Sequence, residues 1–241
     1  MNLAGRKRFW KSASVVDGAS GFGVLLDDRP LRTPAKAPLE VPSRALADAI
    51  AAEWDAQCEA IEPESLGFTR AANTAIDRVA PNPTAVVDAI AEYGGTDLLC
   101  YRAEGPFGLL MRQSEAWDPW LDWSAGTLSA PLIAVTGIMH HAQPAASLSA
   151  LRSGVAVHDP FALVALHDLV SLSGSLVLGL AVSRGALPAA EAWSLSRLDE
   201  TWQIEQWGTD DEAEAAASRR EAGFRQAALM LDLLAARPDI S

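Results

Sequence analysis

The chain has little cysteine and no long hydrophobic run. Its 241 residues include two cysteines, Cys58 and Cys100, which is too few for the disulfide framework of a small secreted domain. We expect both to be buried thiols in a reducing compartment. The longest uncharged helix-like stretch, Leu169–Ser183, is shorter than the roughly 20 residues of a membrane span, so no stable membrane insertion is expected. The N-terminus is basic but has no apolar core typical of a secretory signal, and it is short for a mitochondrial presequence.

Basic side chains are also scarce. The chain has 19 Lys and Arg against 31 Asp and Glu, a net charge of −12. Nucleic-acid binding depends on Lys and Arg that neutralise phosphates, so the composition argues against such a partner. Residues 1–44 carry eight basic and four acidic side chains, whereas residues 45–241 carry 11 and 27. This asymmetry predicts two surfaces of different character. The 49% of apolar residues excludes a disordered chain.

Catalytic and nucleotide-binding motifs are missing. No Gly-Lys pair is present for a P-loop, and neither a G-x-S-x-G elbow nor an H-E-x-x-H helix occurs. His140 and His141 are adjacent, so their side chains point apart and predict no metal site. His167, beside Asp168 within a predicted helix, is expected to be a hydrogen-bonded histidine of the core or its boundary. The sequence thus predicts no enzyme, metal, cofactor or small-molecule substrate.

The hydrophobic pattern predicts an α+β fold. Short apolar runs separated by Gly, Pro and Asp within residues 1–42 predict an antiparallel meander, and Ser43 is the expected N-cap of the first helix. Two further strands are expected at Leu98–Tyr101 and Leu132–Val135. Single helices are expected over 109–128, 161–184, 188–207 and 210–237. We predict a β-rich N-terminal domain with one or two helices at 1–85 and a larger, mainly α-helical domain at 86–241.

Tryptophan is abundant and often stands beside polar residues. Eight are present, and each combines a large apolar area with one N–H that needs a partner. For any single Trp a structural role is the simpler interpretation. We assign structural roles to the following residues of the Trp-containing motifs: Trp10, Trp54, Asp55, Gln57, Trp117 and Asp118.

One acidic segment is less easily explained. Seven acids and no base occur in residues 199–214. Asp210, Asp211 and Glu212 fit the first turn of a helix, where the helix dipole favours negative charge. Glu200 and Glu205 are expected near a helix C-terminus, where negative charge is unfavourable. We therefore predict an acidic surface for a basic partner, made of Glu200, Trp202, Gln203, Glu205, Trp207, Asp210 and Glu212.

Six motifs occur in an order and spacing that resemble a known family. They are Arg8–Lys11, Leu26–Pro34, Glu53–Gln57, Thr96–Arg102, Trp117–Pro119, and Leu198-Asp199-Glu200-x-Trp202-Gln203-x-Glu205-x-Trp207-Gly208-x-Asp210. Together, over about residues 6–236, they resemble the ATP12 family of F1-ATPase assembly chaperones. One departure is Asp28, where the family turn usually has Gly. Asp tolerates the left-handed conformation, so the hairpin is expected to survive.

The resemblance implies a function that composition and spacing do not. Members bind the free α subunit of F1 and keep it from aggregating until a β subunit replaces the chaperone, and they are not enzymes. The family fold joins an N-terminal β-containing domain to a helical one. Mitochondrial members carry presequences, so this chain is expected to be a bacterial cytoplasmic member. Two alternatives remain: an interaction module with a different client protein, or an enzyme with a dispersed site using residues such as His167, Asp168 and Glu200.

Overall fold

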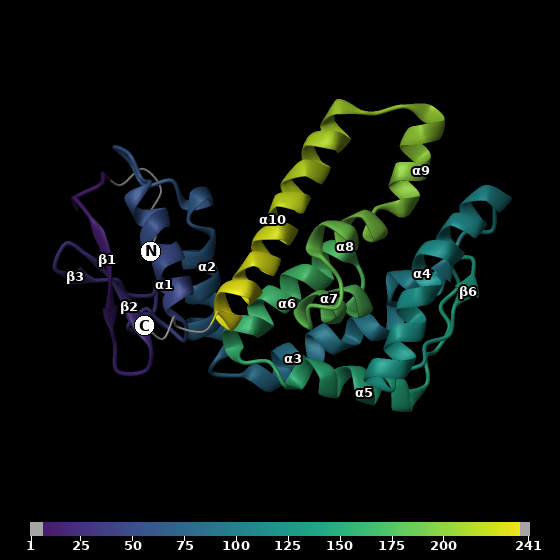
Figure 1. The fold of residues 1–241 in the computed structure, drawn as a ribbon, viewed down its shortest axis with the longest axis horizontal. Coiled ribbons are helices and arrows are strands. Elements are labelled where there is room, and N and C mark those ends of the chain that lie inside the picture. The colour runs from purple at the N-terminus through teal and green to yellow at the C-terminus, as the bar shows by residue number, and fades with distance from the viewer. Residues whose placement is uncertain (1–6, 237–241) are drawn as a thin grey trace. The chain divides into compact units, whose positions relative to one another are not determined.

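The computed structural model describes residues 7–236 and is mixed α+β (Figure 1). The chain divides into two compact units. The first comprises the chain up to Pro83, Pro160–Ala165, and the chain from Leu229 onward. The second comprises Thr84–Asp159 and Leu166–Ala228. The fold class agrees with the pattern of the sequence: short antiparallel strands come first and helices follow.

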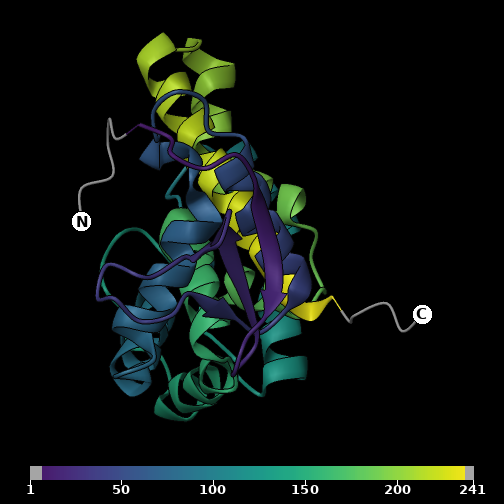
Figure 2. The ribbon, with the colours of Figure 1, turned by 90° about the vertical axis from the view of Figure 1, so that its left-hand side faces the viewer.

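The first unit is built around strand β2. β1 (Ala13–Asp17) pairs antiparallel with the full length of β2 (Phe22–Leu26). On the other edge of β2, β3 (Arg29–Pro30) pairs with its last residues and β4 (Glu40–Val41) with its first. The predicted meander is therefore correct for β1 to β3, and β4 returns to the same central strand. Figure 2 looks onto this sheet, with α1 (Arg44–Asp55) packed behind it.

The β2–β3 hairpin forms, but its left-handed residue is Asp27 and not Asp28. Asp27 has a φ of 52°. Its carboxylate accepts hydrogen bonds from the backbone N–H groups of Lys11 and Ser12 at 3.0 and 3.1 Å. These donors, which stand just before β1, lower the pKa of Asp27 and hold the turn against the start of that strand.

Helices complete the first unit. Ser43 caps α1 as predicted, since its Oγ accepts from Leu46 N at 3.2 Å. The same hydroxyl donates to the carbonyl of Leu233 at 2.7 Å. α1 buries Leu46, Ile50 and Trp54. A 3-10 turn at Pro63–Ser65 precedes α2 (Gly67–Thr74), and a π-helix at Ala75–Val79 continues it.

The second unit is largely helical. Its chain runs through α3 (Pro83–Ala91), a 3-10 helix at Glu92–Thr96, another at Leu98–Cys100, and β5 (Tyr101–Arg102). α4 (Phe107–Leu128) continues through Pro119, and a short β6 (Val135–Thr136) pairs parallel with β5. The remaining helices of the chain are α5 (Ala145–Ala156), α6 (Pro160–Ser173), α7 (Leu176–Ser183), α8 (Ala189–Ser196), α9 (Leu198–Trp207) and α10 (Asp211–Ala235). The start of α6, Pro160–Ala165, and the end of α10 from Leu229 belong to the first unit.

Several predicted elements differ in the structure. The expected helix over 161–184 is two helices, because Gly174 has a φ of +75° and Ser175 caps α7 by accepting from Leu178 N. The expected helix over 188–207 divides at Arg197 into α8 and α9. The predicted strand at Leu98–Tyr101 is a 3-10 turn followed by a two-residue strand. Within residues 7–236, none of the helices combines the length and apolar character needed to cross a bilayer.

Candidate partner-binding surface

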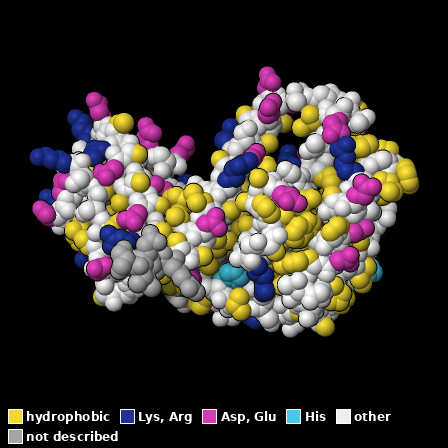
Figure 3. Space-filling view, in the orientation of Figure 1, with side chains coloured by type: hydrophobic (Ala, Val, Ile, Leu, Met, Phe, Trp, Pro, Cys, Tyr) yellow, Lys and Arg dark blue, Asp and Glu magenta, His cyan; other side chains and the backbone are white. Residues whose placement is uncertain are grey.

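The predicted partner-binding residues lie on α9 and at the start of α10. Gly208, with a φ of +89°, ends α9, and Asp210 begins the next helix by accepting from the N–H groups of Glu212 and Ala213 at 2.9 and 3.0 Å. Figure 3 shows acidic side chains where α10 begins. Most of the predicted set is exposed, and two members are half-buried. The exposed residues are Gln203, Glu205, Trp207, Asp210 and Glu212; the half-buried ones are Glu200 and Trp202.

The end of α9 presents apolar surface to solvent. The side chain of Trp207 is 78% exposed, and Ile204, one helical turn before it, is 46% exposed. On the neighbouring helix α4, Phe107 is 76% exposed and Met111 is 44% exposed. Monomeric proteins rarely expose such side chains in groups unless the surface meets a partner. The sequence prediction included Trp207 but omitted the other three.

Two acids of this surface are paired with arginines from outside the acidic segment. Glu205 accepts from Arg112 of α4 at 2.9 Å, and Glu200 accepts from Arg197. The hydrogen bond with Glu205 raises the pKa of Arg112. The local charge is therefore less negative than the sequence of residues 199–214 indicates. The pair of Arg197 with Glu200 could have been predicted from the sequence, because the two stand three residues apart on one helix face. The pair of Arg112 with Glu205 could not, because they are 93 residues apart.

Trp202 joins α9 to α4. The guanidinium of Arg112 lies 5.0 Å from the centroid of its ring. Gly108 lies beneath the same ring, because a Cβ at position 108 would stand 2.9 Å from its Cη2 atom. A side chain on residue 108 would therefore push against the indole. Trp202 is thus a contact within the second unit as well as part of the predicted surface.

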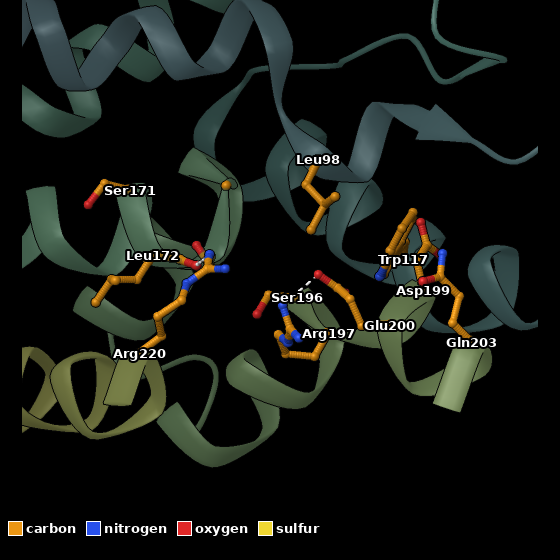
Figure 4. A pocket seen from close by; sticks show the side chains of 12 residues that line it. Leu98, Trp117, Ser171, Leu172, Ser196, Arg197, Asp199, Glu200, Gln203 and Arg220 are labelled. Carbon is orange, nitrogen blue, oxygen red and sulfur yellow. Dashed lines mark hydrogen bonds and ion pairs between the residues drawn. The ribbon is translucent and has the colours of Figure 1, made fainter. Parts of the chain in front are cut away.

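A pocket of about 310 Å³ adjoins the first turn of α9 (Figure 4). Most of the charged groups that line it already have a partner within the described structure. Gln113 donates to Asp199 at 2.8 Å, Arg220 donates to the carbonyl of Leu172 at 2.8 Å, and Glu200 is held by Arg197. Asp199 and Glu200, the carboxylates that line the pocket, are thus both engaged by neighbouring side chains, which is not the nucleophile–base geometry of a catalytic site.

The residues assigned structural roles make hydrogen bonds within each unit, Asp55 and Asp118 from exposed positions and the others from buried ones. In the first, Trp10 donates to the carbonyl of Trp54 at 3.3 Å, and Trp54 donates to Thr69 Oγ1 at 3.0 Å. The carboxylate of Asp55 accepts from Ala13 N at 2.7 Å. The side chain of Gln57 makes three hydrogen bonds, to Glu53 O, Ser65 Oγ and Glu62 N.

In the second unit the Trp117 and Asp118 pair surrounds a buried arginine. Trp117 is fully buried and donates to the carbonyl of Leu195 at 3.0 Å. Arg102 lies 5.2 Å from the Trp117 ring centroid and donates to Asp118 at 2.7 Å. Burial lowers the pKa of Arg102, and Asp118 opposes that effect.

Asp97, which was not among the predicted site residues, is a fully buried carboxylate. It is 0% exposed and accepts from Leu99 N, Ser175 Oγ and Val177 N at 3.0, 2.8 and 2.9 Å. It therefore links the 3-10 turn at Leu98–Cys100 to the start of α7. Burial raises its pKa despite these donors. Its place in the Thr96–Arg102 motif was the available signal.

The histidine and cysteine expectations need two corrections. His167 is exposed, not at the core, and hydrogen-bonds Asp168 at 3.1 Å, a contact that raises its pKa. Cys58 is exposed, whereas Cys100 is buried. Burial raises the pKa of Cys100 to about 12, so its thiol stays protonated and unreactive. Among the described residues, no group of three or more His, Cys, Asp or Glu is placed to hold a metal ion.

Comparison with known proteins gives the same family as the motifs. Residues 7–125 match the family model described as ATP12 chaperone protein. The crystal structure of Atp12 from Paracoccus denitrificans is 50% identical and covers 95% of this chain and 98% of its own, with a TM-score of 0.91. A point mutant of the same Paracoccus protein aligns with equal TM-score and identity.

Two further relatives extend the comparison. The Atu1473 protein of Agrobacterium tumefaciens is 46% identical over 95% of this chain and 86% of its own, with a TM-score of 0.91. The mitochondrial protein atp12 of Schizosaccharomyces pombe is 25% identical over 219 residues, or 86% of this chain and 75% of that protein. The chain therefore belongs to the ATP12 family of chaperones for F1-ATPase assembly and is not an enzyme.

Proposed function

We propose that this protein binds the free F1 α subunit through α9 and the start of α10, and prevents its aggregation until a β subunit takes its place. The observation that carries the proposal is the exposure of Trp207 and Ile204 on α9 and of Phe107 and Met111 on α4, two helices that meet through Arg112, Glu205 and Trp202, in a chain of the ATP12 family. An unassembled α subunit exposes the apolar surface that it later buries against β, and such a surface promotes aggregation.

The mixed chemistry of this surface suits a reversible complex. Exposed aromatic and aliphatic side chains supply the apolar anchors that dominate binding energy. The surrounding charges of Glu205 and Glu212 favour a basic partner surface and steer its approach. A chaperone has to release its client, and a polar rim around a small apolar centre gives lower affinity than a wholly apolar obligate interface. We also propose a bacterial cytoplasmic location, in keeping with the bacterial relatives.

An aggregation assay tests the proposal directly. The α subunit of the same organism is held under conditions where it precipitates, with and without this protein, and the mixture is then resolved by size exclusion. Suppressed light scattering together with a soluble complex is the expected result. Full precipitation and no complex would contradict the proposal and direct attention to a different client protein.

Three charge reversals then locate the surface. Glu200→Lys, Glu205→Lys and Glu212→Lys each reduce the negative charge of the predicted surface, and each is expected to weaken α-subunit binding while the fold is kept. Glu212 is the cleanest of the three, because its exposed side chain is not one of the paired carboxylates. Unchanged binding by all three variants would show that this surface is not the contact.

A further inference from the structure

The short sheet of the second unit has an open edge. β6 pairs with β5 on one side, in the register Tyr101 to Val135 and Arg102 to Thr136, and the N–H of Gly137 donates to the carbonyl of Arg102 at 2.8 Å. Within residues 7–236 no other strand pairs with β6. Figure 1 shows β6 at the outer border of this unit, beside α4. One side of β6 is therefore free to accept another strand.

The free hydrogen-bonding groups of this edge belong to Ala134 and Thr136. Successive residues of a strand turn their backbone N–H and C=O groups to opposite sides, and Val135 and Gly137 face β5. Ala134 and Thr136 are both exposed, and in the part of the chain that the structure describes their outward groups meet no other segment. The edge is short, because Pro131 has no N–H and Gly137, with a φ of +88°, turns the chain away.

The segment around this edge is uncharged and apolar. Residues 130–139 contain no Asp, Glu, Lys or Arg, in a chain whose net charge is −12. Ile133 is 42% exposed, Ile138 is 95% exposed and Met139 is 81% exposed. Natural proteins usually protect an open strand edge with charged side chains, or they cover it with another element. This edge has no charged residue of its own, which indicates that a partner covers it.

We propose that β6 pairs antiparallel with β6 of a second copy of this chain, across a two-fold axis at Val135. In this register Ala134 of each copy faces Thr136 of the other, and the two residues exchange both of their backbone hydrogen bonds. The pairing satisfies the outward groups of both residues in both copies. It also brings Ile138 of one copy close to Leu132 of the other, so exposed apolar surface is covered.

Two observations favour a second copy over a strand of another protein. The free groups of Ala134 and Thr136 stand symmetrically about Val135, so the same edge turned by a two-fold axis matches their number and spacing. The chain is acidic, so two copies repel over much of their surface, and the uncharged segment 130–139 is where their backbones can approach without that cost.

The pairing is expected to be weak. An edge of this length buries less surface than the interface of a stable dimer, so the monomer and the dimer should exchange as the protein concentration changes. The proposal does not depend on binding of the F1 α subunit.

Sedimentation velocity of the whole protein from about 1 μM to about 1 mM tests the proposal. The expected result is a shift from the 25.5 kDa monomer towards a species of twice that mass as the concentration rises. A protein that stays monomeric over the whole range would overturn the proposal.

Two double variants test the register. In Ala134→Lys with Thr136→Lys, every lysine faces a lysine of the other copy, and like charges directly opposite each other destabilise a strand pair. In Ala134→Lys with Thr136→Glu, every lysine faces a glutamate. The first variant is expected to weaken the dimer at least about tenfold, although it lowers the net negative charge, and the second to keep it. Equal weakening by both would contradict the register.

Cross-linking locates the two-fold axis. Val135 faces the same residue of the other copy in a non-hydrogen-bonded pair, whose Cα atoms lie about 4.5 Å apart, a separation that a disulfide can span. Val135→Cys is therefore expected to oxidise to a covalent dimer, in a Cys58→Ser background because Cys58 is exposed. Thr136→Cys is the control, since the two copies of residue 136 stand two residues apart along the strands. Equal cross-linking of both variants would contradict the axis.

A strand of the α subunit is the other possible occupant of this edge. A wild-type protein that stays monomeric, together with lower α-subunit affinity in Ala134→Lys with Thr136→Lys, would assign the edge to the client and overturn pairing with a second copy. Circular dichroism of each variant separates loss of pairing from loss of the fold.

Discussion

Arg112 on α4 and Glu205 on α9 form an ion pair with 2.9 Å between Nη1 and Oε1, and the same guanidinium lies 5.0 Å from the ring centroid of Trp202. One arginine therefore contacts two residues of the proposed partner surface. Both side chains of the pair are partly exposed, so the pair contributes little to folding. The two contacts of Arg112 instead fix the positions of the Glu205 and Trp202 side chains relative to α4.

The first prediction concerns the charge of Glu205. Glu205→Lys places a cation beside Arg112 and removes an acid from the surface, so affinity for the α subunit should fall by about tenfold or more. The melting midpoint should change little, because the lost pair is solvent-exposed. Interferometry with immobilised α subunit measures the affinity, and circular dichroism follows the melting.

A charge exchange separates direct contact from positioning. In Arg112→Glu with Glu205→Lys, the two opposite charges face each other again, but α9 still carries a lysine. Binding that stays weak in this double variant would agree with direct contact between Glu205 and the client. Full recovery would contradict it and show that the pairing itself is what matters.

A second prediction contrasts a buried with an exposed tryptophan. Trp54 is 4% exposed and Trp207 is 78% exposed. Trp54→Ala should lower the free energy of unfolding by about 3–5 kcal/mol, as for other large buried aromatics. Trp207→Ala should change it by less than about 0.5 kcal/mol, yet weaken α-subunit binding by at least about tenfold as an exposed aromatic anchor.

Urea unfolding and the aggregation assay measure these two effects on the same pair of proteins. Each variant is the other's control, since both remove one indole. An unchanged unfolding midpoint in Trp54→Ala would contradict its structural assignment. Full protection of the α subunit by Trp207→Ala would remove the apolar anchor from the proposed surface.

Local signals in the sequence predicted the first unit well. Turn residues between short apolar runs indicated β1 and β2, and Ser43 before a helical pattern indicated the start of α1. A turn or a helix cap is formed by a few residues that are adjacent in the sequence, so it can be recognised without knowing the tertiary contacts. The domain boundary at residue 85 stays a prediction. So do the roles assigned to the individual site residues.

The break between α6 and α7 had no distinctive local signal. Apolar residues continue on all sides through 161–184, and Gly174 stands among similar small residues such as Ser171 and Gly179. At this break Asp97 accepts hydrogen bonds from Ser175 Oγ and Val177 N, which lie about 80 residues away in the sequence. The partner of Glu205 was equally inaccessible, because Arg112 is 93 residues distant in the sequence.

The third prediction uses two glycines of α4. Gly126 has open space where a Cβ would stand, whereas a Cβ on Gly108 would lie 2.9 Å from Trp202. Gly126→Ala should therefore stabilise the protein by about 0.5–1 kcal/mol, the usual gain for Ala within a helix. Gly108→Ala should lose that gain, because the indole has to move.

Movement of Trp202 should also reach the partner surface. Gly108→Ala is expected to weaken α-subunit binding several-fold, and Gly126→Ala to leave it unchanged. Urea unfolding and the size-exclusion complex provide the two readouts. Equal stabilisation by both substitutions would mean that Trp202 accommodates the methyl group, and would contradict its role as a fixed contact between α4 and α9.

The last prediction concerns the pH dependence contributed by Asp97. Burial raises the pKa of this carboxyl above its ordinary value of 3.8, so in the pH range just above 3.8 the folded state keeps a proton that the unfolded state has lost. Protonated Asp97 therefore favours the folded state over the unfolded state. This contribution to the free energy of unfolding is fully present below about pH 3.8 and is lost as the pH rises through the pKa of Asp97 in the folded protein. Asp97→Asn does not titrate, so the difference in unfolding free energy between wild type and variant isolates this group.

Urea unfolding of both proteins from pH 3 to pH 7 measures that difference. Asp97→Asn should destabilise at low pH, and the advantage of the wild type should shrink as the pH rises. The Asn side chain replaces one acceptor oxygen with an N–H donor, which cannot satisfy all three groups that now donate to Asp97. An advantage that grows with pH would show that the hydrogen bonds from Leu99, Ser175 and Val177 outweigh burial and hold the pKa of Asp97 below its ordinary value.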